Sequence, residues 1–161
     1  MRAMLLVVGL SACATTPALP EGAHAVSLPV MPLRTLDDQP AALADAIHGR
    51  PALVSLWATW CESCATEFGA LGRLAPKAEA KGAYVVAIAE GEAPATVAAF
   101  VRARGLAYPN LVDEAYAVGD AIGARRIPAT LVLDRKGRVV FRGAALDRPA
   151  LLALDRAIEA E

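Results

Sequence analysis

The stretch Trp-Ala-Thr-Trp-Cys-Glu-Ser-Cys at residues 57–64 decides the fold, because it separates two segments with different hydrophobic patterns. The segment before it, residues 52–56, is a short apolar run rich in branched residues, which is typical of a buried strand. After it, apolar residues recur at helical spacing from Cys61 to about Lys81. The pattern therefore places both cysteines where a strand ends and a helix begins, inside the first turn of that helix.

This placement favours redox chemistry at the two cysteines. Residues three apart on a helix are neighbours on one face, so a disulfide between Cys61 and Cys64 can close. The free amide groups of the first turn and the positive end of the helix dipole favour a thiolate at Cys61. Strand, Cys-x-x-Cys and helix together form the arrangement that dithiol–disulfide exchange requires.

Two other uses of a Cys-x-x-Cys motif fit the sequence less well. Covalent haem attachment needs a histidine directly after the second cysteine, where this chain has Ala65. Tetrahedral zinc needs two further ligands, and the only histidines are His24 and His48. We therefore expect no metal site and no cofactor.

The length and composition of the chain indicate one domain with an additional segment at one end. The chain has 161 residues, of which 17 are acidic and 16 basic, for a net charge of −1. No basic stripe is present, so we expect no nucleic-acid partner. Three cysteines are too few for a disulfide-stapled scaffold.

The N-terminal residues predict export. Arg2 precedes a short apolar run over residues 3–10, too short to span a membrane but suited to a signal peptide. Leu-Ser-Ala-Cys at residues 10–13 resembles a bacterial lipobox, which predicts a signal peptide over residues 1–12 and lipidation of Cys13. The alternative is a secretory signal with an incidental cysteine. Residues 13–25 then form a tether, and the folded domain comprises residues 26–161.

The remaining hydrophobic pattern predicts a mixed α/β sheet with helices on both faces. Gly69 and Pro76 are expected to bend or interrupt the helix that follows the cysteines. An edge strand or hairpin is expected over residues 26–36 and a central strand over 52–58. Further strands are expected over 84–89 and 110–112, and a hairpin over 129–134 and 138–142. The other expected helices are 41–47, 94–104, 114–122 and 147–160.

These motifs together resemble the TlpA/ResA-type thiol–disulfide oxidoreductases of the thioredoxin superfamily. The resemblance rests on Leu-Trp-Ala-Thr-Trp-Cys-x-x-Cys, on Glu67 three residues beyond Cys64, and on Ile-Pro-Ala-Thr at residues 127–130. It covers residues 26–161. The resemblance implies a thioredoxin-like three-layer fold, with a central mixed sheet, an N-terminal strand or hairpin extension and an inserted helix over residues 94–104.

The resemblance also implies roles for three residues near the motif. Cys61 is expected to be the exposed attacking thiolate, and Cys64 the buried resolving thiol. Glu67 lies on the same helical face as Cys64 and is expected to assist its deprotonation. The alternative for Glu67 is an ordinary solvated glutamate. Thioredoxins carry an acid where this chain has Ser55, which leaves Glu67 as the expected proton carrier.

Substrate contacts follow from the same resemblance. The Ile127–Pro128 bond is expected to be cis and to face the cysteines, leaving the main chain of Ile127 free to pair with an extended substrate. Trp60 is expected to pack beside the cysteines and shield them, whereas Trp57 is expected in the core. Two departures, Glu62-Ser63 between the cysteines and Gly69 in place of a helix-kinking proline, leave the potential and the local helix geometry open.

The expected function is an exported, lipid-anchored oxidoreductase in the bacterial cell envelope, facing the periplasm or extracytoplasmic space. It is expected to reduce specific disulfides of proteins such as apocytochrome c, and to receive electrons from a membrane thiol reductant. The alternatives are a thiol peroxidase, a copper chaperone or assembly factor that uses both thiols as ligands, and a static structural disulfide. The surroundings of Cys61 lack the threonine and arginine pattern of a peroxidase.

Overall fold

The computed structural model describes residue 28, residues 31–124 and residues 126–160. The predicted signal peptide over 1–12, the tether over 13–25 and the lipidation site Cys13 lie outside these residues and remain predictions. Within the described residues, none of the helices has the length and apolar composition that crossing a membrane requires.

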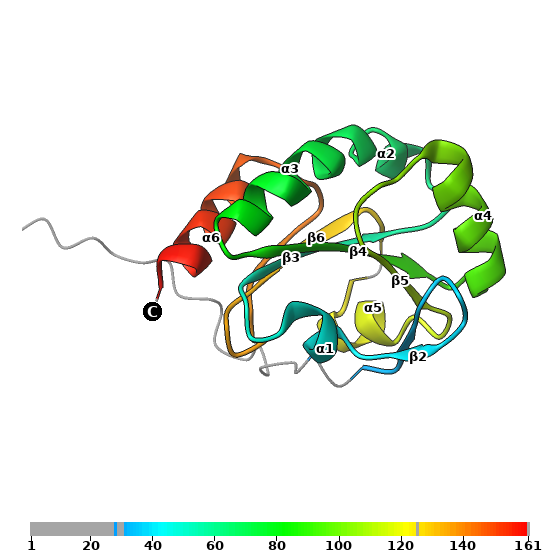
Figure 1. Cartoon of the computed structure of the whole chain (residues 1–161), viewed down its shortest axis with the longest axis horizontal. Helices are drawn as coiled ribbons and strands as arrows, with labels where there is room; N and C mark the ends of the chain where they lie inside the picture. Colours follow the sequence, from blue (N-terminus) through cyan, green and yellow to red (C-terminus); the bar gives the residue numbers. More distant parts are fainter. Residues whose placement is uncertain (1–27, 29–30, 125, 161) are drawn as a thin grey trace, which may run out of the picture.

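A mixed seven-stranded sheet forms the centre of the fold, in the order β2-β1-β5-β4-β3-β6-β7 (Figure 1). The pairs β3–β4 and β4–β5 are parallel, and the remaining pairs are antiparallel. The strands are β1 (Leu33–Arg34), β2 (Pro40–Ala41), β3 (Ala52–Trp57), β4 (Tyr84–Glu90), β5 (Asn110–Asp113), β6 (Ala129–Leu133) and β7 (Val139–Gly143).

Helices cover both faces of this sheet, which confirms the predicted three-layer thioredoxin-like architecture (Figure 1). In Figure 1, α2, α3, α4 and α6 lie on one side of the sheet, and α1 and α5 on the other. The helices are α1 (Leu43–Ile47), α2 (Glu62–Ala65), α3 (Phe68–Ala80), α4 (Pro94–Arg104), α5 (Ala117–Ile122) and α6 (Arg148–Glu159). The helix α4 is the insertion expected between two parallel strands.

The central strand β3 contributes to two hydrophobic cores, one on each face of the sheet. All six of its residues are buried, as the continuous apolar run predicted. Because alternate residues of a strand face opposite sides, Leu53 and Trp57 enter the core under α3, whereas Val54 and Leu56 enter the core near α1 and α5. Strand β3 therefore holds the two layers of helices together.

The helix after the cysteines is interrupted at a position that the sequence did not predict. Thr66 and Glu67 separate α2 from α3, whereas Gly69 and Pro76 both lie inside α3. The amide of Thr66 bonds to the Ser63 carbonyl, and the amide of Glu67 to the Cys64 carbonyl. These bonds span three residues instead of four, so the chain tightens here and the α-helical ladder stops.

Two other boundaries also differ from the prediction. The helix expected from residue 114 begins at Ala117. Its N-cap residue, Tyr116, has a left-handed backbone conformation, and the Asp113 carboxylate accepts hydrogen bonds from the Ala115 and Val118 amides on either side of it. Among the described residues the N-terminal hairpin comprises residues 33–41, later than the predicted range of 26–36, of which residues 26–27 and 29–30 lie outside the described part of the chain. It extends the sheet by pairing Arg34 with Val112 of β5.

Removing the Phe68 ring should test the core above the sheet. The Phe68 ring centroid lies 5.2 Å from that of Trp57 and 6.0 Å from that of Phe100, and both contacts are edge-to-face. We expect Phe68→Ala to lower the free energy of unfolding by about 3 kcal/mol, because it leaves a cavity among aromatic rings. Chemical denaturation measures the change. The control Leu152→Ala, at a position that is 45% exposed, should change it by less than about 0.5 kcal/mol.

Candidate active site

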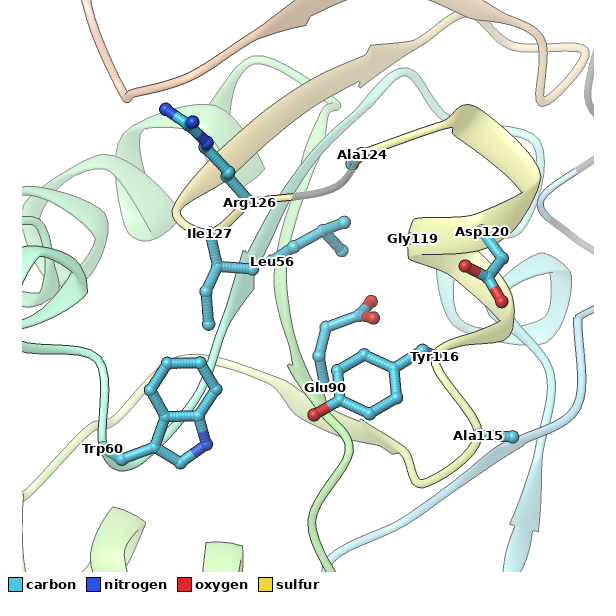
Figure 2. Close-up of a pocket in the computed structure, with 10 residues that line it drawn as sticks. All are labelled: Leu56, Trp60, Glu90, Ala115, Tyr116, Gly119, Asp120, Ala124, Arg126 and Ile127. Atoms are coloured by element: carbon cyan, nitrogen blue, oxygen red, sulfur yellow. The ribbon is translucent and has the colours of Figure 1, made fainter.

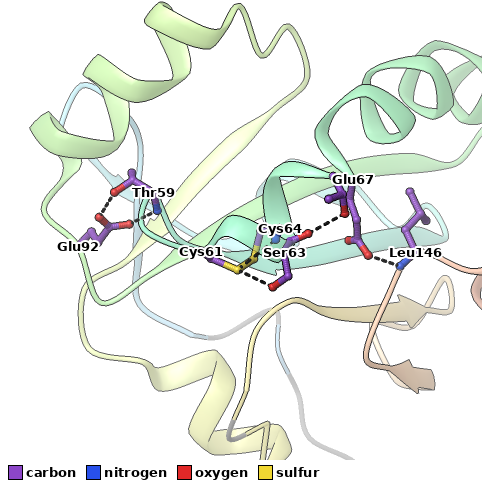
Figure 3. Close-up of a disulfide and its surroundings, with 8 residues drawn as sticks. Thr59, Cys61, Ser63, Cys64, Glu67, Glu92 and Leu146 are labelled. Atoms are coloured by element: carbon purple, nitrogen blue, oxygen red, sulfur yellow. Dashed lines mark hydrogen bonds between the residues drawn. A yellow bond between two sulfur atoms is a disulfide. The ribbon is translucent and has the colours of Figure 1, made fainter.

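The two cysteines of the motif form a closed disulfide at the start of α2 (Figure 3). Their sulfur atoms are 2.00 Å apart and their Cα atoms 5.3 Å apart. Cys61 is the N-cap residue of α2, and its Sγ accepts a hydrogen bond of 3.2 Å from the Cys64 amide. The Ser63 hydroxyl lies 3.5 Å from the same sulfur. Both groups can donate to a thiolate on Cys61 when the disulfide is open.

The exposure of the motif differs from the prediction. Cys61 is only 7% exposed and Cys64 only 2%, because both pack into the core cluster that contains Trp57. The expectation of an exposed Cys61 is therefore wrong for this disulfide form. The neighbouring Trp60 is 63% exposed instead. Its side chain therefore lies open to solvent next to Cys61 and does not shield the disulfide as predicted.

Glu67 is joined to the cysteines through the main chain and to a distant loop through its side chain. The Glu67 amide donates to the Cys64 carbonyl over 3.0 Å, and Glu67 Oε1 accepts the Leu146 amide over 2.9 Å (Figure 3). Its second oxygen is buried without a hydrogen-bond partner among the described residues. Because the helix is interrupted here, the tight turn of the main chain places Glu67 beside Cys64, and the predicted continuous helical face does not exist.

The environment of Glu67 favours its protonated form. Burial raises the pKa of this carboxyl above its usual value, the hydrogen bond from Leu146 opposes the rise, and the negative charge of Asp147 adds to it. A carboxyl with a raised pKa binds a proton more strongly than a solvated carboxyl does. This is the property that a proton relay to a buried thiol requires.

The loop before β6 lies next to the start of the active-site loop. The Ile127–Pro128 peptide bond is cis, as predicted. In the antiparallel pairing of β6 with β3, Ala129 lies opposite Leu56. Pro128 therefore comes beside the end of β3, where the chain turns toward Cys61, and Ile127 packs against the core cluster that contains the cysteines.

Glu92 holds the active-site loop from the neighbouring strand, and sequence reasoning missed it. Its two carboxylate oxygens accept hydrogen bonds from the Thr59 amide, over 2.7 Å, and from the Thr59 hydroxyl (Figure 3). Glu92 follows the carboxyl end of β4, which runs parallel to β3. The carboxyl ends of parallel strands meet at one edge of a sheet, where functional groups of α/β proteins gather. The acidic residues 90 and 92 at this strand end were the available signal.

No metal centre is built from the described residues. Among residue 28, residues 31–124 and residues 126–160, no group of three or more histidine, cysteine or acidic side chains could hold a metal ion.

The fold and the cysteine pair define a class of protein: a thioredoxin-like protein with a Cys-x-x-Cys disulfide at the start of a helix. Within that class the chain belongs to the redoxin family, whose profile matches residues 15–153. It is a TlpA/ResA-type member of the thioredoxin superfamily, as the motifs predicted.

Similar curated proteins carry the name thiol-disulfide oxidoreductase ResA. The chain is 29% identical over 94 residues to the protein of this name from Bacillus thuringiensis (strain Al Hakam), which covers 58% of this chain and 54% of that protein. It is also 29% identical over 94 residues to that of Bacillus subtilis (strain 168), covering 58% and 52%. The chain thus spans about half the length of the curated relatives it matches.

Solved structures share the fold. A secreted thiol-disulfide isomerase from Corynebacterium glutamicum has a TM-score of 0.70 at 21% identity, covering 83% of this chain and 86% of its own. A thiol:disulfide interchange protein from Chlorobium tepidum TLS has a TM-score of 0.64 at 23% identity, covering 84% and 95%. At such identities the likeness establishes the fold alone.

The two hydrogen bonds that Thr59 donates to Glu92, called the clamp below, should have a measurable effect on the active-site loop. We expect Glu92→Ala to speed hydrogen exchange at the Thr59 amide about fivefold and to lower the free energy of unfolding by about 1 kcal/mol, because both Thr59 donors lose their acceptor. Amide exchange followed by NMR gives the rate. Thr59→Ser retains both donors and should keep its amide protected. An unchanged exchange rate in Glu92→Ala would show that the clamp does not restrain the loop.

Proposed function

We propose that this protein is a thiol–disulfide oxidoreductase that reduces specific disulfides of other proteins. The observation that carries the proposal is the Cys61–Cys64 disulfide at the start of α2, beside the loop of cis Pro128. The names of the ResA relatives support the same activity.

The reaction proceeds in two exchange steps. The Cys61 thiolate attacks one sulfur of the substrate disulfide, which forms a mixed disulfide and releases the first substrate thiolate. The Cys64 thiolate then attacks Cys61 Sγ, which closes the Cys61–Cys64 disulfide and releases the second substrate thiolate. Two electrons pass from the dithiol to the substrate, and each released thiolate takes up one proton.

Glu67 is the base that we assign to the second step. The Cys64 thiol is buried, and burial disfavours its ionisation. Glu67 follows Cys64 by one tight turn, and its buried oxygen without a partner is free to accept the proton. A carboxyl whose pKa is raised by burial binds that proton more strongly than a solvated one does.

The substrate chain is bound at the main chain of Ile127 and over the exposed Trp60. An extended peptide would pair with the main chain of Ile127 in the loop before β6, in the manner of strand addition. Trp60 offers an exposed aromatic face beside Cys61. Trp60, directly before Cys61, and Ile127, directly before cis Pro128, line one pocket from two different loops, so together they can orient a cysteine-bearing segment toward Cys61.

The proposed setting is the bacterial cell envelope, with a lipid anchor on Cys13 and the domain on the periplasmic or extracytoplasmic side. The apolar residues 3–10 and the lipobox-like residues 10–13 support export and anchoring. A dithiol in an oxidising compartment needs a supply of electrons, so a membrane thiol reductant is the proposed donor. Apocytochrome c is a proposed substrate, because its paired cysteines must be reduced before haem attachment.

The redox potential of the cysteine pair tests the direction of electron flow. We expect a reducing couple, closer to the thioredoxin value of about −270 mV than to the value of about −120 mV of a strong oxidant. Equilibration with glutathione buffers, read by thiol alkylation and mass spectrometry, measures it, with Cys61→Ala as the control. A value near that of the strong oxidant would overturn the reductase assignment, and copper binding without disulfide reduction would favour the copper-chaperone alternative.

The role of Glu67 predicts a defect with a characteristic pH dependence. We expect Glu67→Gln to slow the release of a preformed mixed disulfide at Cys61 about tenfold, because Cys64 loses its base. In the unmodified protein this rate should rise with pH as Glu67 ionises, at a pH above the usual carboxyl range, since the pKa of Glu67 is raised. Single-turnover kinetics across pH measure both effects.

A purely structural role for Glu67 makes a different prediction. If Glu67 only held the loop at Leu146, Glu67→Gln would leave the rate and the pH profile of the release step unchanged, because the glutamine amide oxygen can still accept the Leu146 amide. Glu114→Gln, which removes an exposed carboxyl outside the motif, is the matched control and should leave that profile as it is in the unmodified protein.

A further inference from the structure

A pocket of about 370 Å³ lies beside the active-site loop, on the side of the sheet covered by α5 (Figure 2). Trp60 and Ile127 border it, so it adjoins both residues assigned to substrate binding. Tyr116 and Asp120, from the start of α5, form the opposite side. Its volume falls within the range of small-ligand sites, at about 300–1,000 Å³.

A buried carboxyl group occupies the floor of this pocket. Glu90 is the last residue of β4 and is only 2% exposed, yet its side chain points into the pocket (Figure 2). Its Oε2 lies so close to α5 that a Cβ added at Gly119 would come within 2.9 Å of it. Its Oε1 has no hydrogen-bond partner among the described residues. A buried polar atom left without a partner is costly, so a donor group placed in the pocket would stabilise Oε1.

The charges around Glu90 favour a cation as that donor group. Desolvation raises the pKa of Glu90 to about 8, and the negative charges of Asp113 and Asp120 contribute to the rise, against a hydrogen bond from the Gly119 amide. A positive group in the pocket would lie near the Glu90 and Asp120 carboxyl groups, which both line it, and would oppose this rise. Arg126, which also lines the pocket, extends away from Glu90 (Figure 2).

Two aromatic side chains complete a site suited to a flat or extended cation. Trp60 and Tyr116 stand on opposite sides of the opening, 63% and 45% exposed (Figure 2). The Tyr116 ring is held against the main chain, since a Cβ on Gly91 would lie 2.0 Å from a ring carbon. Arginine and lysine side chains bind well over aromatic faces, arginine more often.

We propose that this pocket binds a basic side chain, arginine or lysine, of the polypeptide whose disulfide the protein reduces. The proposal rests on the reductase function proposed above. The pocket shares Trp60 and Ile127 with the disulfide site, which favours a side chain of the substrate over a free small cation as the occupant. A basic residue near the target cysteine then becomes a determinant of substrate choice, and its binding releases the proton of Glu90.

Matched peptides test the proposal with the full-length, reduced protein. Each peptide carries one cysteine in a mixed disulfide with a coloured thiol, and has either arginine or the neutral isostere citrulline at one of the three positions on either side. Release of the coloured thiol gives the rate constant. Above the pKa of Glu90 we expect the best arginine peptide to react about tenfold faster than its citrulline partner, as for a charge-assisted contact.

The rate constant of the arginine peptide divided by that of its citrulline partner is the ratio that the pocket should control, and its pH dependence identifies the group that binds the cation. Dividing the two rate constants cancels the titration of Cys61, which affects both peptides equally. Because a cation binds the ionised carboxyl, the ratio should fall as the pH drops through about 8, where Glu90 takes up its proton. Asp113, Asp120, Tyr116 and Arg126 are the other titratable groups around Glu90. A ratio that is independent of pH would overturn the assignment to Glu90.

Three variants localise the effect. Glu90→Gln preserves the shape but cannot ionise, so the ratio should fall to near one and lose its pH dependence. Asp120→Asn, at an exposed position on the rim, keeps the test valid if Glu90→Gln does not fold, and should lower the ratio about twofold. The control Glu114→Gln changes an exposed carboxyl that does not line the pocket and should leave both rates unchanged.

The remaining outcomes separate this proposal from the reductase function. Reduction of arginine and citrulline peptides at equal rates would overturn the pocket assignment and leave the reductase function standing. Reduction of neither peptide would overturn both. Agmatine, titrated while Trp fluorescence is recorded, tests a free cation as the occupant. If agmatine bound in a Glu90-dependent manner while the peptide rates stayed equal, the pocket would serve a free cation and not the substrate chain.

Discussion

The pairing of β3 with both of its neighbours is the constraint on which the site depends. Its parallel register with β4 brings Ala89 beside Trp57, and its antiparallel register with β6 brings Ala129 beside Leu56. Three chain segments that are distant in sequence therefore end at one edge of the sheet: the loop to Cys61, the loop with Glu92 and the loop with Pro128. Complete burial of β3 resists any slip in register, because a shift of one residue would turn its side chains to the wrong core.

Glu67 and Glu90, on the two faces of this sheet, are separate carboxyl groups whose pKa values are raised by burial. Glu67 lies at the junction of α2 and α3, and Glu90 points toward α5, since it follows Ile88 by two residues on the other face. Burial is the main cause of the raised pKa in both. We assign the first to the exchange chemistry and the second to substrate recognition, so the two functions can be altered independently.

The local pattern predicted much of the fold but not the breaks and contacts that depend on neighbours. The central strand, the helix α4 and the late hairpin follow from hydrophobic runs, helical spacing and turn residues, and the structure has all three. The interruption at Thr66 and Glu67 carries no glycine or proline, so sequence rules pointed to Gly69 and Pro76 instead. Cys61 was expected to be exposed from its place in the first turn, yet tertiary packing buries it against the core.

The sequence by itself determined the cysteine pair, its place between a strand and a helix, the Ile-Pro motif at residues 127–128 and the family, because each of these is written in contiguous residues. Only the tertiary structure decided which distant groups surround the pair. Leu146 reaches Glu67 across 79 residues, and Glu92 reaches Thr59 across 33. The environment of Glu90 likewise combines β4, β5 and α5. Burial and the approach of charges across such separations depend on strand order and helix packing, which no local pattern contains.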